Sequence, residues 1–336
     1  MRIIIKNIIA HILYYTGIVY LLERILLKNC CIVLVYHRIT SPEKEDVPVQ
    51  DGMYVRPDVF EKHLRYLKSR YEFISLEKLL SILNNGGSFN KACHITFDDG
   101  WHDNYTNAFP LLKKYHVPAT VFLATDFIGT FEWFWPEKIL YLLEKTRRVK
   151  LGEQTAIESK EVLRIFHQES VSEENRINNA INFLKKRPIE MIQSVIKDLK
   201  RVTGMNNFPP NRLLLNWDEI REMGECGVTF GSHTKTHAIL TNLDNVDEIQ
   251  NELTGSKAVI ERETGKKVCS FCFPNGNFSS DLIEAVKRSG YDCAFVGERG
   301  TLSNTHSPYN LKRIGIHNDI SYNTPLFACR LLFRFF

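Results

Sequence analysis

The sequence of 336 residues predicts an α/β fold, a distorted (β/α) barrel of about seven parallel strands with a helical insertion. From residue 31 onward, apolar runs rich in β-branched residues alternate with segments that have helical spacing. The apolar runs are almost continuous, which is typical of parallel strands buried on both faces. Seven or eight such units favour a closed barrel over an open sheet.

Seven segments are the candidate strands, and each is a short apolar run flanked by polar or turn-forming residues. They are residues 31–36, 72–75, 92–97, 118–124, 227–231, 268–273 and 291–296. Helices are expected between most of them. Pro57-Asp58 is a helix-start signal, and Phe60, Leu64 and Leu67 after it lie on one face of the expected helix. Residues 217–223 show the same pattern.

One region interrupts the alternation. Residues 132–212 contain amphipathic stretches and no convincing strand, so we expect a helical insertion within a barrel domain of residues 30–320. The remaining segments are an apolar N-terminal helical segment, residues 1–29, and an apolar and basic tail, residues 321–336.

The amino-acid composition argues against few classes of function. The chain has 43 basic and 39 acidic residues but no long basic block, so nucleic-acid binding has little support. Eight scattered cysteines in so long a chain do not resemble a disulfide framework, and we interpret most of them as buried free thiols.

Both termini are unusually apolar. Charged or polar residues interrupt residues 3–27, which leaves too short a run to span a bilayer, and no cleavage site of a secretory signal follows. The C-terminal Leu and Phe residues alternate with arginines, as in interfacial segments. We expect attachment to a membrane surface on the cytoplasmic side. The alternatives are that the ends pack against the domain, or that the protein is exported and anchored.

The first chemical motif is Asp98-Asp99-Gly100, at the end of an apolar strand. Strand ends form the active face of parallel α/β folds, and two buried adjacent carboxylates need a cation or hydrogen bonds to compensate them. Gly100 permits a sharp turn. An ordinary Asp-Gly turn is the alternative.

The second motif places His233 and His237 directly after another strand. Histidines four residues apart lie on one side of a helical turn and can bind one metal ion, although such a pair is often accidental. Two histidines and one carboxylate at one rim would form a ligand set with open positions.

Two weaker candidates follow other strands. The turn at 273–276 could direct the backbone N–H of Asn275 into a cleft, or it could be a plain turn. His37 closes the first strand, where it could act as a general acid or serve as a structural histidine.

Taken in order, these motifs resemble the polysaccharide deacetylase family, carbohydrate esterases with a chitooligosaccharide deacetylase-like domain. TFDDG at 96–100 and SHTKTH at 232–237 are similar to its first two motifs, and VLVYHRI at 33–39 is similar to a branch of poly-N-acetylglucosamine deacetylases. The resemblance covers about residues 31–317. It implies metal-dependent removal of acetyl groups from an N-acetylated sugar.

The resemblance also implies roles for single residues. Asp99, His233 and His237 would bind a divalent metal, zinc in our expectation, and Asp98 would be the general base. The N–H of Asn275 would stabilise the oxyanion.

The general acid would be His37, with His317 as the weaker candidate. The chain departs from the family at 270–274, where an arginine that orients the base is usual, and at Asn275, where an aromatic residue is usual. The first departure leaves the orientation of Asp98 unexplained.

Two other functions remain open. One is a metal-dependent hydrolase of a small non-sugar amide, and the other is a non-catalytic, membrane-associated protein of polysaccharide assembly. The expected partner is an N-acetylated carbohydrate, and the sequence does not indicate an oligomeric state.

Overall fold

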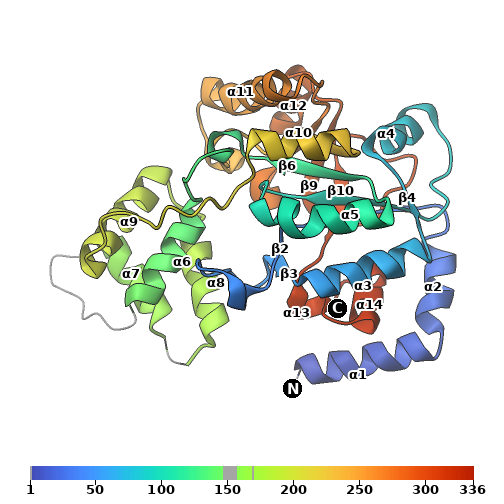
Figure 1. Ribbon diagram of the computed structural model, residues 1–336, viewed down its shortest axis with the longest axis horizontal. Coiled ribbons are helices and arrows are strands. Elements are labelled where there is room, and N and C mark those ends of the chain that lie inside the picture. Colours follow the sequence, from blue (N-terminus) through green and yellow to red (C-terminus); the bar gives the residue numbers. More distant parts are fainter. Residues whose placement is uncertain (1, 147–156, 169) are drawn as a thin grey trace. The chain divides into compact units, whose positions relative to one another are not determined.

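The computed structural model describes residues 2–146, 157–168 and 170–336 (Figure 1). The chain separates into two compact units. The larger unit comprises Met1–Ser41, Met53–Thr130 and Leu214–Phe336, and the smaller comprises Pro42–Gly52 and Phe131–Leu213. Every residue predicted to be functional lies in the larger unit.

Seven parallel strands form a closed ring in the larger unit. Strand β5 pairs back with β1, so the ring has no free edge and the predicted seven-stranded barrel is confirmed. In ring order the strands are β1 (Cys31–Tyr36), β10 (Leu311–Gly315), β9 (Cys293–Arg299), β8 (Ser270–Cys272), β7 (Val228–Ser232), β6 (Ala119–Leu123) and β5 (Ala92–Phe97).

The membership of the ring differs in one place from the prediction. The expected strand at 72–75 exists as β4 (Glu72–Phe73), but it pairs only with the first two residues of β5 and lies outside the ring. Strand β10, which the sequence analysis did not predict, completes the ring between β1 and β9. Its sequence LKRIG contains two charged residues, so it lacks the continuous apolar run that identified the other strands.

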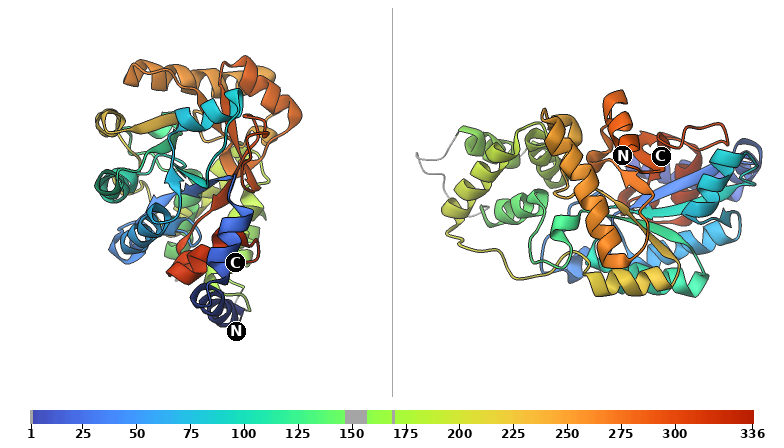
Figure 2. Two further views of the ribbon diagram at one scale, coloured as in Figure 1. Left: turned by 90° about the vertical axis from the view of Figure 1, so that its right-hand side faces the viewer. Right: turned by 90° about the horizontal axis from the view of Figure 1, so that it is seen from above.

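Helices cover the outside of the barrel (Figures 1 and 2). They are α3 (Pro57–Lys68), α4 (Leu76–Asn85), α5 (Phe109–Tyr115), α10 (Trp217–Glu225), α11 (Val246–Thr264) and α12 (Ser280–Arg288). Helix α3 begins at Pro57, and Phe60, Leu64 and Leu67 are fully buried, as the periodicity predicted. A short parallel pair, β2 (Arg38–Ile39) and β3 (Tyr54–Val55), lies apart from the barrel sheet.

Four helices make up most of the smaller unit: α6 (Trp135–Thr146), α7 (Ile157–Phe166), α8 (Glu173–Leu184) and α9 (Ile189–Thr203). Buried aliphatic residues from all four, such as Leu143, Leu163, Ile181 and Leu199, form its own core. The amphipathic stretches noted in the sequence supply much of this core, because their apolar faces pack against one another.

The chain ends meet in the larger unit. Helices α1 (Arg2–Tyr15) and α2 (Ile18–Leu26) pack against α14 (Thr324–Leu332), which follows the short helix α13 (Asn318–Ser321). Helix α14 is largely buried, with Phe327 and Cys329 fully enclosed. Among the described residues, no single helix is long and apolar enough to cross a membrane. Residues 4–15 and 18–26 reach the required length only as a pair bent by 77°.

Candidate metal centre and active site

The carboxyl-terminal ends of the strands bring the predicted residues together. Asp98 and Asp99 follow β5, His233 and His237 follow β7, and His37 follows β1. In a parallel barrel these ends share one rim, which is where such folds place their chemistry. Both aspartates and His233 are buried, while His37 and His237 retain partial exposure.

Asp99, His233 and His237 converge on one point. Oδ1 of Asp99 lies 3.4 Å from Nε2 of His233 and 3.1 Å from Nε2 of His237. Atoms bound tetrahedrally to one zinc ion at about 2.0–2.1 Å are separated by about 3.3 Å, so these spacings fit a shared divalent cation. Two imidazole nitrogens and one carboxylate oxygen are also suitable donors for such an ion.

The backbone of Asp99 and one indole fix its carboxylate. Asp99 has φ +75°, a strained conformation for a residue with a Cβ, and it directs the side chain into the site. Nε1 of Trp101 donates a hydrogen bond of 2.8 Å to Oδ2, which leaves Oδ1 for the histidines. Gly100 is required next, because a Cβ there would lie 2.8 Å from Cδ2 of Leu123.

Backbone contacts orient the first histidine. Nδ1 of His233 donates to the carbonyl oxygen of Cys272 at 2.8 Å, so Nε2 faces Asp99. Metal-binding histidines are commonly oriented in this way by a partner on the second ring nitrogen.

A buried carboxylate on α11 holds the loop between the two histidines. Glu252 accepts hydrogen bonds from the backbone N–H groups of Lys235 and Thr236 at 2.7 and 3.0 Å, and from the Thr236 hydroxyl at 2.8 Å. These charge-assisted bonds fix the loop and thereby the position of His237.

Arg313, which no sequence pattern indicated as a site residue, orients the predicted base. Its Nη1 and Nη2 donate to Oδ1 and Oδ2 of Asp98 at 2.7 and 2.8 Å, with both side chains buried. The arginine expected near 270–274 is therefore absent from that segment, and β10 supplies a guanidinium instead. A register irregularity of the β9–β10 pair lies beside Arg313.

Electrostatics keep Asp98 ionised. Burial by itself would raise its pKa, but the charge of Arg313, helped by His233 and His37, outweighs burial and lowers the pKa below the ordinary value. The Cys272 thiol lies 3.7 Å from both carboxylate oxygens and 3.0 Å from Nη2 of Arg313. Burial raises the pKa of this thiol, so Cys272 is neutral beside the pair.

His37 lies next to the base. Its Nε2 is 4.0 Å from Oδ2 of Asp98, and its side chain is 28% exposed, so it can reach a substrate. Burial of the ring lowers the pKa of His37 despite the opposing charges of Asp99 and Asp98. His317, the weaker candidate, contacts Asp319, with Nδ1 2.9 Å from the carboxylate.

The turn after β8 contains Asn275. This residue has φ +57°, and its side chain is exposed and donates to Asn277. Gly276 allows the turn to contact β9, because a Cβ at Gly276 would lie 2.3 Å from the Cα of Gly297. The oxyanion role of the Asn275 N–H stays a prediction.

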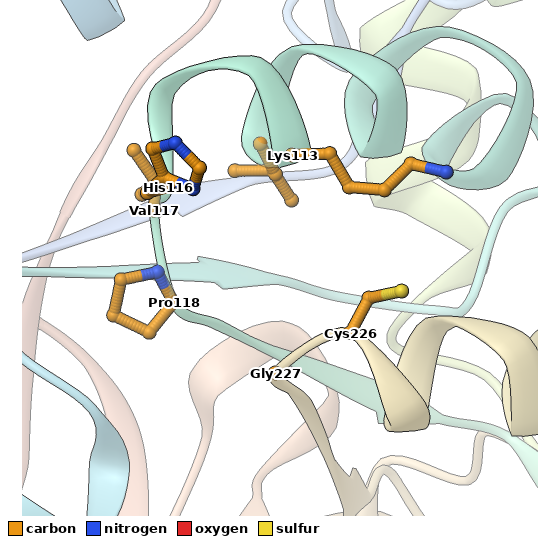
Figure 3. A pocket seen from close by; sticks show the side chains of 7 residues that line it. Lys113, His116, Val117, Pro118, Cys226 and Gly227 are labelled. Atoms are coloured by element: carbon orange, nitrogen blue, oxygen red, sulfur yellow. The ribbon is translucent and has the colours of Figure 1, made fainter.

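Two surface hollows lie away from this rim. One, of about 450 Å³, is bordered by Leu112, Lys113, His116, Val117, Pro118, Cys226 and Gly227 (Figure 3). Pro118 and Gly227 directly precede β6 and β7, so this hollow lies at the opposite strand ends. The other, of about 460 Å³, includes Thr229, Cys269 and Asp292, close to the starts of β7, β8 and β9. Neither hollow contains a predicted site residue.

Comparison with known proteins identifies the family. The sequence profile described as polysaccharide deacetylase matches residues 86–294, well over half of the chain. The chain belongs to the polysaccharide deacetylase family. This match confirms the resemblance noted from the motifs at 96–100 and 232–237.

Individual relatives agree with this assignment. The chain is 27% identical to poly-beta-1,6-N-acetyl-D-glucosamine N-deacetylase of Staphylococcus epidermidis over 237 residues, or 65% of this chain and 77% of the relative. It is 21% identical to YxkH of Bacillus subtilis over 291 residues, or 86% and 72% of the two chains. The deacetylase PplD of Streptococcus pyogenes, solved with acetate, shares the fold at a TM-score of 0.55 and 20% identity, covering 87% and 94% of the two chains.

Proposed function

We propose that this polysaccharide deacetylase homologue is a metal-dependent enzyme that removes acetyl groups from an N-acetylated sugar in a polysaccharide, oligosaccharide or glycolipid. The observation that carries the proposal is the convergence of Asp99, His233 and His237 beside a second carboxylate, Asp98, held by Arg313. The S. epidermidis relative, named for deacetylation of poly-N-acetylglucosamine, supports the substrate class.

Asp99, His233 and His237 would hold the divalent ion, for which we propose zinc. When bound, the ion would supply an activated water and polarise the acetyl carbonyl. Trp101 and the Cys272 carbonyl orient the ligands in advance, so little reorganisation accompanies binding.

Asp98 would accept the proton of the attacking water. Each carboxylate oxygen has two lone pairs, so the two bonds from Arg313 leave acceptor capacity on Asp98. The same bonds fix the plane of the carboxylate, and a fixed base is more effective than a mobile one.

His37 and Asn275 would complete the reaction. Because burial lowers the pKa of His37, the ring would take up a proton in the course of the reaction and donate it to the leaving amine, which departs poorly as an anion. The Asn275 N–H would stabilise the oxyanion, a contribution of roughly 3 kcal/mol for one such donor.

Acetate release from the purified full chain tests the proposal. The substrates are oligomers of β-linked N-acetylglucosamine, a lipid-linked N-acetylglucosamine and a small N-acetyl amino acid, each with and without a chelator and added zinc. We expect acetate from a sugar substrate, loss with the chelator and recovery with zinc. Acetate from the amino acid alone would support a small-amide hydrolase, and no acetate from any substrate would support a non-catalytic role.

Three variants test the residue roles. We expect Asp98→Asn to retain metal and lose turnover, and His233→Ala to lose both. Asp292→Asn makes the same chemical change far from the rim and serves as the control. Full activity of Asp98→Asn would exclude Asp98 as the base.

A further inference from the structure

Helices α1 and α2 present an apolar surface that the fold does not cover. Of the fifteen large apolar side chains that are exposed among the described residues, eleven lie on these two helices. They are Ile4, Ile5, Ile8, Ile9, Ile12, Tyr15, Ile18, Tyr20, Leu21, Ile25 and Leu26. So dense a cluster is unusual on the surface of a soluble protein and marks an interaction site.

The opposite faces of the same helices are fixed to the larger unit. Ala10 and Val19 are buried, and Asn323 donates a hydrogen bond to Asn7 across the contact with the C-terminal segment. In Figures 1 and 2 the two helices run along the edge formed by α3 and α14. The exposed apolar side chains on α1 recur three or four residues apart, so they form one face.

Glu23 anchors α2. Its carboxylate is fully buried and accepts hydrogen bonds from the hydroxyls of Tyr66 and Tyr71 at 2.6 and 3.0 Å. It also pairs with Lys91 at 3.2 Å and Arg70 at 3.6 Å. Withdrawal of α2 into a bilayer would separate this carboxylate from four partners and leave buried charges uncompensated.

The contacts of Glu23 argue against a membrane span formed by the two helices. Within the part of the chain that the structure describes, only the bent pair satisfies the length and apolarity of a span, and α2 cannot leave the barrel without breaking the Glu23 contacts. A helix with one face packed on a domain and the other apolar and exposed can instead lie in the plane of a membrane interface.

The charges around the surface indicate the partner. The exposed charged residues within residues 4–28 are Lys6, Arg24 and Lys28, and the one acidic residue of this range, Glu23, is buried. Cations beside an apolar face complement anionic lipid headgroups. A two-fold contact with a second copy would instead bring the same cations together.

We propose that α1 and α2 dock the protein in the plane of a bilayer that contains anionic phospholipid, with α14 remaining in the protein core. The apolar side chains enter the acyl boundary, and Lys6, Arg24 and Lys28 contact headgroup phosphates. Within the C-terminal segment that resembled an interfacial segment, α14 is largely buried and adds nothing to this surface, and Phe335 beyond it is exposed. This inference does not depend on the catalytic proposal.

Flotation of the full-length protein with vesicles tests the docking. The vesicles are phosphatidylcholine alone or phosphatidylcholine with about 30 mol% phosphatidylglycerol, whose negative surface attracts basic side chains. We expect binding to the anionic vesicles and at least a tenfold loss of bound protein for Ile8→Glu/Ile12→Glu. Lys6→Glu/Lys28→Glu should lose binding to the anionic vesicles selectively.

The matched control is Ile189→Glu/Val246→Glu. Both residues are exposed, and each occupies the first position of its helix, where an acidic side chain is tolerated. This variant should bind like wild type. Equal binding by wild type and Ile8→Glu/Ile12→Glu would overturn the proposal, as would a wild-type dimer that Ile8→Glu/Ile12→Glu converts to a monomer without any vesicle binding.

Depth measurements separate docking from spanning. A tryptophan introduced at Ile4, Ile12 or Ile25, measured as the signal added to that of the four native tryptophans, should be quenched by lipids brominated near the headgroup and little by lipids brominated near the bilayer centre. A graded depth along the three positions would indicate a span and contradict the proposal. Mass spectrometry of the intact protein isolated from cells should show that residues 4–28 are present. A mass that lacks them would also contradict the proposal.

Discussion

Arg313 and Asp98 form a two-pronged ion pair across the barrel, with both guanidinium–carboxylate distances below 2.9 Å. The two residues are 215 positions apart in the sequence. Arg313 lies on β10 and Asp98 directly follows β5, and only β1 separates these strands in the ring. Two parallel hydrogen bonds define an orientation that one bond cannot, so Arg313 fixes the plane of the Asp98 carboxylate, the proposed base.

Replacing Arg313 by lysine should lower kcat while leaving bound metal and KM nearly unchanged. Lysine retains the charge but cannot make both hydrogen bonds, and a base misplaced by about 1 Å loses roughly 100-fold in rate. Acetate-release kinetics and metal analysis would measure this. Arg299→Lys is the control, since Nη2 of Arg299 donates to the backbone carbonyls of Arg330 and Phe333 in the C-terminal segment and not to the rim. An unchanged kcat in Arg313→Lys would remove the positioning role.

Trp101→Phe should weaken metal binding by about 10-fold or more. Phenylalanine retains most of the packing but lacks the N–H that holds Oδ2 of Asp99, and loss of such supporting bonds typically costs 10- to 100-fold in affinity. Competition with a chromophoric chelator would measure the dissociation constant. Trp133→Phe deletes an equally buried indole N–H, bonded to Asn211 in the smaller unit, and should leave metal affinity unchanged.

Glu252→Ala should weaken metal binding and lower turnover, because Lys235 and Thr236 lose the acceptor that fixes their loop. Glu252→Gln keeps the shape and part of the hydrogen bonding, so it should recover most of the affinity. Glu261→Ala removes another carboxylate of α11 that holds a backbone N–H, that of Val268, and should not affect the metal. Equal metal affinity in Glu252→Ala and Glu261→Ala would show that the loop needs no such support.

His94 should make folding stability depend on pH between about 4 and 6.5. Its ring is buried, donates to the Ile74 carbonyl and contacts the Thr120 hydroxyl, and burial lowers its pKa to about 4. The folded state therefore binds fewer protons than the unfolded state in this range, so stability is complete above pH 6.5 and is lost as pH falls towards 4. The loss from this residue is about 3 kcal/mol.

Denaturant unfolding at several pH values would measure the effect. His94→Gln removes the titrating group, so its stability should fall less steeply between pH 6.5 and 4 than that of wild type. Identical slopes for wild type and His94→Gln would show that His94 does not titrate as expected.

The convergence of Asp99, His233 and His237 could be predicted from the sequence because each of them belongs to a short local motif. Asp99 follows an apolar strand, and His233 and His237 are four residues apart in one loop. Their convergence could be predicted because parallel strand ends share a rim. The structure adds only the distances between them.

Arg313 could not be predicted in the same way. It lies in a five-residue strand whose Lys312-Arg313 pair breaks the apolar pattern, and its partner is distant in sequence. In a sequence, a buried arginine cannot be distinguished from an exposed one until the carboxylate that it pairs with is known. The unexplained orientation of Asp98 was the signal that a cation was missing, but nothing in the sequence indicated which one. Trp101 and Glu252 could not be predicted for a similar reason. Trp101 acts by holding the Asp99 carboxylate, and Glu252 acts by holding the loop that carries His237.

The ring closes through β1, whose neighbours are β5 and β10. Until the strand at Leu311–Gly315 has been synthesised, β1 can therefore pair on one side only. That strand also carries the guanidinium that holds Asp98, so closure of the barrel and support of the proposed base depend on the same five residues. A nascent or truncated chain that ends before residue 311 has both an open sheet edge and an unsupported base.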